Sequence, residues 1–254
     1  MEEILRVEDL SLHYGAGQVK ALDRVSFQLP KGCRAALVGP NGAGKSSLFK
    51  AILGLEKGVS GKVSLLGQSE KLDQVIQKNV AYIPQASQVN WQFPARVLDI
   101  VLMGRFAHTS GFFRRPSSLD KEKAEQALEE MKISDLRNRQ IDQLSGGQRQ
   151  RVFLARALAQ EAELYMMDEP LAGIDQVTEQ VIMDCLKKFQ QEGKTSLVIH
   201  HDLLTLEKYF DYVLWLNGRL VAEGPMDQVD LLQAYQAAYG QEPALFLKEG
   251  LGHA

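Results

Sequence analysis

At residues 39–46 the chain has the sequence Gly39-Pro40-Asn41-Gly42-Ala43-Gly44-Lys45-Ser46, which fits the pattern G-x-x-x-x-G-K-[ST] of phosphate-binding loops. A short apolar stretch typical of a buried strand, residues 35–38, comes directly before it, and a helical pattern over 46–53 follows. A glycine-rich turn that matched this pattern by chance would not be expected to lie between a buried strand and a helix. The loop glycines let backbone N–H groups turn towards phosphate oxygens, Lys45 supplies a positive charge and Ser46 offers a hydroxyl to Mg²⁺. We therefore expect a nucleoside triphosphate to bind here.

A second glycine-rich stretch, Leu144-Ser145-Gly146-Gly147-Gln148, opens the helix that the pattern predicts over residues 147–159. The N-terminus of a helix attracts anions, because its first backbone N–H groups have no partner within the helix. One bound nucleotide does not account for two such helix starts in one chain.

Outside these two stretches, strand and helix patterns alternate along the chain. Strands are predicted at residues 5–12, 25–29, 61–66, 79–83, 164–167, 196–199, 212–216 and 219–222. Helical spacing is present around 97–101 and over 120–131, the segment 104–116 is predicted to be a loop, and Gly218 is predicted to form a hairpin turn. A helical cap is expected from Met226 onwards.

This order predicts an α/β fold: a P-loop NTPase core with a mainly parallel sheet, an antiparallel β-subdomain and an inserted helical subdomain. We expect the first part of the nucleotide-binding core at residues 1–93 and the helical subdomain at 94–160. The second part of the core is expected at 161–225, and a C-terminal helical tail at 226–254.

The composition excludes several classes of protein. A net charge of -3 over 254 residues leaves no basic excess of the kind that nucleic-acid binders carry. No apolar stretch approaches the ~20 residues of a membrane span, and the acidic start Met1-Glu2-Glu3 does not resemble a signal peptide. Cys33 and Cys185 are isolated, so we expect two buried thiols in a reducing cytosol.

Two adjacent carboxylates follow the apolar stretch 164–167, at a strand end where α/β sheets place their ligands. Asp168 can reach the coordination shell of Mg²⁺, and Glu169 can accept a proton from an attacking water. The alternative is an ordinary acidic turn before Pro170. The phosphate loop in the same chain favours the functional interpretation.

A polar group also follows the strand predicted over 196–199, namely His200-His201-Asp202. A histidine beside a terminal phosphate can hydrogen-bond to it and hold a water in line. Two alternatives are a helix cap, for which Asp202 is well suited, and a metal site. Gln85 is a further polar residue just after a predicted strand.

Together these residues resemble the ATP-binding cassette (ABC) ATPases, matched in order over nearly the whole chain. The resemblance implies ATP and Mg²⁺ as ligands, with Glu169 and His201 catalytic. The implied ATP contacts are Tyr14, which would stack on adenine, Gly39, Pro40, Asn41, Gly42, Ala43, Gly44, Lys45, Ser46, Ser47, Gln85 and Asp168. Of these, Ser46, Gln85 and Asp168 would bind the Mg²⁺ of Mg-ATP.

In this family two cassettes pair head to tail, and the second glycine-rich stretch, called the signature, contacts ATP held by the other copy. The implied contacts across such a homodimer are Ser145, Gly146, Gly147, Gln148 and Asp175. The chain departs from the family at 172–175, where Ala-Gly-Ile-Asp replaces the commoner Ser-Ala-Leu-Asp. Because Asp175 is present, we expect only altered packing there.

The segments 82–105 and 111–116 are similar to the ATPase subunits of bacterial manganese, zinc and iron importers. The resemblance implies a membrane permease as partner, an extracellular metal-binding protein acting indirectly, and a peripheral location on the cytoplasmic face of the cell membrane. Manganese is the first expectation, zinc the second and iron the third. The alternatives are an importer of siderophores, haem or cobalamin, and a soluble ABC ATPase acting on nucleic acid or ribosomes.

An aromatic stretch shortly after Gln85 suits a groove that receives a helix from a membrane partner. Trp91 and Phe93 are the candidates for that contact. For Val97, Ile100 and Val101 we favour burial in the core of the insertion.

Overall fold

The computed structural model describes residues 2–15, 19–108 and 115–240. The chain forms two compact units. Unit 1 consists of the chain up to Asp73 together with the chain from Leu197, and unit 2 is Gln74–Ser196. The strand β7 (Thr195–Ile199) begins in unit 2 and ends in unit 1.

Unit 1 contains the antiparallel sheet predicted from the alternating stretches. Its strand order is β2-β1-β4, with β1 at Glu3–Tyr14, β2 at Val19–Pro30 and β4 at Val59–Leu65. On β1, Val7 faces Phe27 of β2 on one side and Val63 of β4 on the other. Residues 16–18, between β1 and β2, lie outside the described residues.

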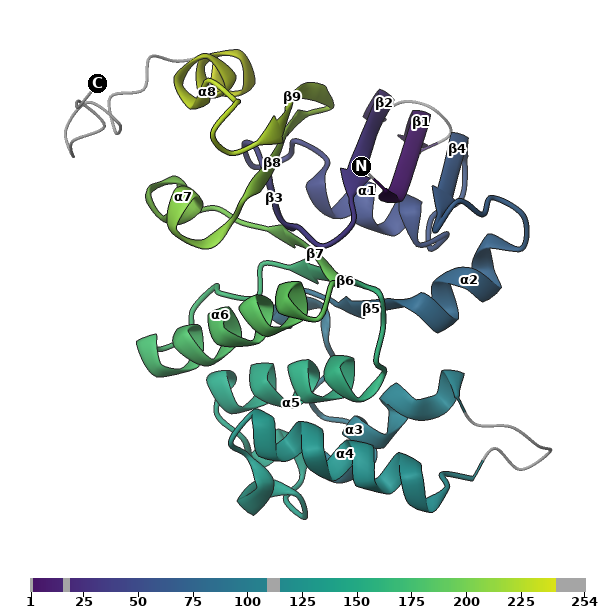
Figure 1. Cartoon of the computed structure of the whole chain (residues 1–254), viewed down its shortest axis with the longest axis vertical. Helices are drawn as coiled ribbons and strands as arrows, with labels where there is room; N and C mark the ends of the chain where they lie inside the picture. Colours follow the sequence, from purple (N-terminus) through teal and green to yellow (C-terminus); the bar gives the residue numbers. More distant parts are fainter. Residues whose placement is uncertain (1, 16–18, 109–114, 241–254) are drawn as a thin grey trace. The chain divides into compact units, whose positions relative to one another are not determined.

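The parallel strands of unit 1 surround the strand that leads into the phosphate loop. β3 (Arg34–Val38) lies between the end of β7 and β8 (Tyr212–Asn217), and it is parallel to β8. β9 (Arg219–Pro225) returns antiparallel to β8, which confirms the hairpin at Gly218. The helices of this unit are α1 (Lys45–Ile52), a short 3₁₀ helix (Leu203–Thr205), α7 (Leu206–Tyr209) and α8 (Leu231–Tyr239). Figure 1 shows α8 beside β8 and β9.

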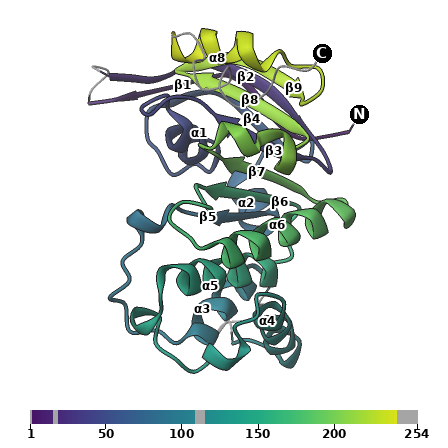
Figure 2. The same ribbon diagram turned by 90° about the vertical axis from the view of Figure 1, so that its left-hand side faces the viewer.

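Unit 2 combines a parallel strand pair with helices. β5 (Val80–Ile83) is parallel to β6 (Leu164–Asp168). In Figure 2, α3 (Val97–Met103), α4 (Ser118–Glu130) and α5 (Gly146–Ala159) pack against one another. Their apolar faces are buried as predicted, including Val97, Leu128 and Val152 at 0% exposure. Short 3₁₀ helices occupy Ala86–Gln88, Gly104–Ala107, Ser134–Leu136 and Ile141–Gln143.

Besides the four-residue α7, two helices were not predicted from the sequence. α6 (Gln176–Gln191) buries one face through residues three and four apart, among them Ile182, Leu186 and Phe189. α2 (Leu72–Asn79) has the apolar residues Leu72, Val75 and Ile76 at helical spacing, but these side chains are only half-buried and the pattern spans just two turns. In the predicted loop 104–116, Gly104–Ala107 is a 3₁₀ helix and residues 109–114 lie outside the described residues.

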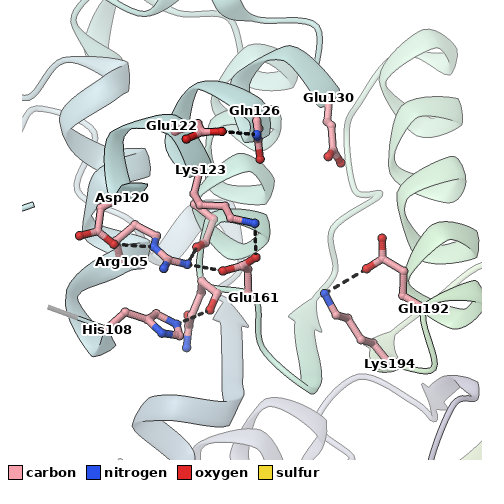
Figure 3. Close-up of polar contacts among 12 residues, drawn as sticks. Arg105, His108, Asp120, Glu122, Lys123, Gln126, Glu130, Glu161, Glu192 and Lys194 are labelled. Carbon is pink, nitrogen blue, oxygen red and sulfur yellow. Dashed lines mark hydrogen bonds and ion pairs between the residues drawn. The ribbon is translucent and has the colours of Figure 1, made fainter. Parts of the chain in front are cut away.

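A buried ion-pair network, shown in Figure 3, joins the 3₁₀ helix Gly104–Ala107, α4 and the end of α5. The Arg105 guanidinium is 4% exposed and donates to Asp120 Oδ1 at 3.0 Å, Ala159 O at 2.7 Å and Glu161 Oε2 at 2.8 Å. Gly104 packs so closely here that a Cβ would lie 2.2 Å from Arg156 O. The network therefore holds together three segments that are separate in the sequence.

Within residues 2–15, 19–108 and 115–240, no helix has the length and hydrophobicity needed to cross a membrane. Cys33 and Cys185 are free and buried, as predicted. Burial raises the pKa of the Cys33 thiol to about 12 and raises that of Cys185 further. Both side chains are therefore neutral thiols at pH 7.

Candidate functional site

The phosphate loop follows β3 directly and leads into α1, as its sequence predicted. Two of its glycines have no room for a side chain: a Cβ at Gly39 would lie 2.0 Å from Leu216 O, and one at Gly44 would lie 2.6 Å from Ala21 O. Both have a positive φ, 152° and 90°. Glycine at these positions lets the loop lie closely against neighbouring backbone.

The loop presents positive charge at the start of α1. Gly44 caps this helix without any side-chain hydrogen bond, and the first turn contains no acidic residue, so the helix dipole is not neutralised there. The buried Lys45 ammonium donates to Gly39 O at 2.7 Å and to Pro40 O at 2.9 Å. The start of a helix and a lysine ammonium therefore lie together at this loop, an arrangement that suits an anion.

Tyr14, at the end of β1, lies beside the first turn of α1. Its hydroxyl donates to Ser47 Oγ at 3.3 Å, and the ring is half-buried. Burial raises the pKa of this phenol, so it stays protonated. The contact places an aromatic ring at the edge of the phosphate loop.

In unit 2, two neighbouring strand ends bring Gln85 and Glu169 together. Ile83 of β5 pairs with Met167 of β6, and Gln85 Nε2 donates to Glu169 Oε2 at 2.8 Å. Glu169 has a φ of 52°, which is unusual outside glycine and characteristic of constrained sites. The sequence predicted both residues at strand ends but did not predict this bond.

Asp168, the last residue of β6, is fully buried, while Glu169 is half-buried. Desolvation, and to a lesser degree the charge of Asp168, raise the pKa of the Tyr82 phenol to about 12. The oxygen-bearing side chains Ser46 in unit 1 and Gln85 and Asp168 in unit 2 are of the type that Mg²⁺ prefers.

The signature turn forms a capping box at the start of α5. Ser145 Oγ accepts from Gln148 N at 3.3 Å, and Gln148 Oε1 accepts from Ser145 N at 3.0 Å. Because Ser145 accepts in this bond, its hydroxyl proton can still be donated. Ser145 and Gly146 are exposed and Leu144 is buried, so the turn is anchored from within and faces solvent.

Asp175 caps α6 within its own chain. Its carboxylate accepts from Thr178 N and from Thr178 Oγ1, both at 2.9 Å, and these bonds lower its pKa. Gly147 of the signature packs on this cap, since a Cβ there would lie 2.9 Å from Thr178 Oγ1. Sequence reasoning missed Thr178, although an Asp-x-x-Thr pattern is a recognisable helix start.

The two histidines after β7 have different surroundings. His200 is buried and its Nε2 lies 2.8 Å from Thr205 Oγ1, while His201 is exposed. Asp202 Oδ1 accepts from Leu204 N at 3.0 Å and caps the following 3₁₀ helix, which is the helix cap named above as an alternative. Among the described residues, no group of three or more His, Cys, Asp or Glu side chains is placed to hold a metal ion.

The aromatic candidates after Gln85 also differ. Trp91 donates its Nε1–H to Ala86 O at 2.9 Å, packs edge-on against Phe153 and lies under the Arg149 guanidinium, so it belongs largely to the packing of α5. Phe93 is 57% exposed. Val97, Ile100 and Val101 are buried, as predicted.

Comparison with known proteins agrees with this geometry. Residues 22–172 match the model of the family described as ABC transporter. The chain is 44% identical to the "Manganese transport system ATP-binding protein MntB" of Halalkalibacterium halodurans, covering 98% of this chain and 97% of the relative. It is 47% identical to the "Zinc transport system ATP-binding protein TroB" of Treponema pallidum, covering 93% and 86%.

Among solved structures, a nucleotide-free ATP-binding cassette from an ABC transporter matches with a TM-score of 0.77 and 27% identity, covering 98% of this chain and 99% of that one. The fold predicted from the sequence is therefore confirmed. The chain belongs to the ABC transporter family, as one of its ATP-binding cassette ATPases.

Proposed function

We propose that this cassette hydrolyses ATP to drive uptake of a divalent transition metal ion, manganese first and zinc or iron next, through a separate membrane permease. The observation that carries the cargo assignment is the likeness to manganese and zinc transport subunits over nearly the whole chain, at 44% and 47% identity. Residues 111–114, part of the stretch on which that resemblance rests, lie outside the described residues.

In unit 1 we assign the triphosphate to residues 39–47, with Tyr14 stacking on adenine and His201 contacting the terminal phosphate. The glycines that admit no side chain, and the start of α1, where no side chain provides a capping hydrogen bond, support this assignment. In unit 2 we assign Gln85 and Asp168 to the Mg²⁺ of Mg-ATP, which Ser46 of unit 1 would also serve. Mg²⁺ would neutralise phosphate charge when bound.

Glu169 acts as general base and takes a proton from the attacking water. The bond that Gln85 donates to Glu169 Oε2 supports this role, because it orients the carboxylate. The exposed signature turn supports a head-to-tail pair of cassettes, in which Ser145, Gly146, Gly147 and Gln148 face the ATP of the other copy. Asp175 would contribute at the same interface while it caps α6.

The proposed partners are a second copy of this chain, permease subunits and, indirectly, an extracellular metal-binding protein, with no nucleic acid. The chain would then lie at the cytoplasmic face of the cell membrane. The exposed Phe93 supports a permease contact near Gln85. We retain the predicted division into core parts 1–93 and 161–225, helical subdomain 94–160 and tail 226–254.

The decisive experiment measures metal uptake in cells that carry the permease with the wild-type cassette, with Glu169→Gln, or without the cassette. Mn²⁺, Zn²⁺ and Fe²⁺ are offered separately, and siderophore, haem and cobalamin serve as competing cargoes. We expect Mn²⁺ uptake only with the wild-type cassette. Uptake of siderophore, haem or cobalamin, but of none of the three metal ions, would assign the chain to an importer of that cargo. Uptake of every cargo that is the same with and without the cassette would refute transport through this permease.

A further inference from the structure

The back of the phosphate loop rests on the β8–β9 hairpin, inside unit 1. Ala43 O accepts a hydrogen bond from Gly218 N at 2.9 Å. On the same side, a Cβ at Gly39 would lie 2.0 Å from Leu216 O and 3.1 Å from its carbonyl carbon. The loop therefore cannot move towards the hairpin unless the hairpin moves with it.

The hairpin is anchored on one side to β2. Gly218 O accepts from Asp23 N at 2.8 Å, and the Arg219 guanidinium pairs with the Asp23 carboxylate. Hydrogen bonds from Lys20 and then Arg219 hold the pKa of Asp23 at about 2, so this anchor is charged at neutral pH.

The other anchor of the hairpin is the C-terminal helix. Asn217 Nδ2 donates to Ala238 O at 2.9 Å, in the last turn of α8, where backbone carbonyls have no partner within the helix. The fully buried Trp215 contacts Tyr235 and Tyr239 edge-on at 6.4 Å, and these two rings stack at 4.5 Å. Packing therefore fixes α8 on β8, and the Asn217 amide ties the end of α8 to the turn.

We propose that α8 positions the phosphate loop through Asn217 and the β8–β9 hairpin, which makes Asn217 a positioning residue for the triphosphate. The path begins at Ala238 O, which accepts a hydrogen bond from Asn217. It continues through the next residue, Gly218, whose N–H donates to Ala43 O in the phosphate loop. It rests on the assignment of the phosphate loop to ATP. Because the path ends at the loop and does not include Glu169, it acts on ATP affinity and leaves the hydrolytic step unchanged.

The test compares Asn217→Ala and Asn217→Asp with the wild-type chain, and Gln236→Ala is the matched control. Asp keeps the size of Asn but cannot donate to Ala238 O, whereas Gln236 is an exposed amide on the same helix. Affinity is measured by titration with a fluorescent ATP analogue, KM and kcat by steady-state hydrolysis, and folding by thermal unfolding.

Both Asn217 variants should raise the Kd and KM for ATP by about threefold to tenfold, the net effect of one hydrogen bond, with kcat unchanged. Gln236→Ala should leave all three values unchanged. The proposal is overturned if either Asn217 variant binds ATP as the wild type does, or if kcat falls while Kd stays the same. It is also overturned if Gln236→Ala weakens binding equally, since the effect would then be general destabilisation.

A Lys45→Ala arm separates this proposal from the assignment of the loop. If Lys45→Ala also binds ATP normally, the loop assignment itself is wrong. If only the Asn217 variants bind normally, the assignment stands and the role of α8 is refuted.

Discussion

Replacing Arg105 with methionine should destabilise unit 2 by removing the centre of its buried ion network. Deleting one partner of a buried ion pair costs about 3–5 kcal/mol, because the other charge is left without compensation. The low end of this range applies to Arg105→Met, because both carboxylates keep other partners. Asp120 Oδ2 keeps bonds of 2.8 and 2.7 Å from Ser117, and Glu161 is 39% exposed and keeps Lys123 at 2.7 Å.

We therefore expect a loss of about 3 kcal/mol in the free energy of unfolding. For a chain of this size that corresponds to a fall in Tm of about 6–12 °C. Urea unfolding followed by circular dichroism measures the first value, and a thermal scan measures the second. Lys123→Met is the matched control, because its pair with Glu161 is a third exposed on both sides and contributes about 0–1 kcal/mol.

The loss of unfolding free energy in Arg105→Met should depend on pH, and the direction follows from the pKa of Asp120. Bonds from Ser117, and then the Arg105 pair, lower the pKa of Asp120 from 3.8 to about 2. A depressed pKa contributes stability above the unfolded value of 3.8, and this contribution disappears as pH falls towards 2. The difference between wild type and Arg105→Met should therefore be largest near pH 7 and shrink below about pH 4. A loss no greater than that of Lys123→Met, or one that grows in acid, would refute this account of the network.

Four further outcomes concern the nucleotide site. Glu169→Gln should keep ATP binding and the bond from Gln85 while kcat falls by about 10²- to 10⁴-fold, and normal turnover would show that Glu169 is not the base. Lys45→Ala should weaken ATP binding by about 10- to 100-fold, as loss of a charge-assisted hydrogen bond implies; an unchanged Kd would remove it from the site. Ser145→Arg should bind ATP normally but fail to pair with a second cassette in light scattering, and retained hydrolysis would contradict a contact in trans. Gly147→Ala should lower turnover by pressing on Thr178 Oγ1, and Thr178→Ala in the same chain should restore part of it; no restoration would mean that this contact is not the cause.

Several features could be predicted from the sequence because they depend on local chemistry. The pattern over residues 39–46 predicts a phosphate loop without knowledge of the rest of the fold, because it combines glycine, lysine and serine at fixed spacing between a buried strand and a helix. The carboxylates after residues 164–167 and the amphipathic pattern over 120–131 are equally local. α6 shows the limit, since its apolar residues have helical spacing and yet it was not predicted.

Tertiary structure alone decided which of these local features touch. Gln85 reaches Glu169 because β5 and β6 pair in one particular register, and Gly147 rests on Thr178 because α5 packs beside α6. Arg105 is buried only because α4 and the end of α5 supply its acceptors, and Asn217 meets Ala238 only because aromatic packing seats α8 on β8. These contacts join residues far apart along the chain, so their geometry depends on how whole elements pack, which short-range spacing does not specify.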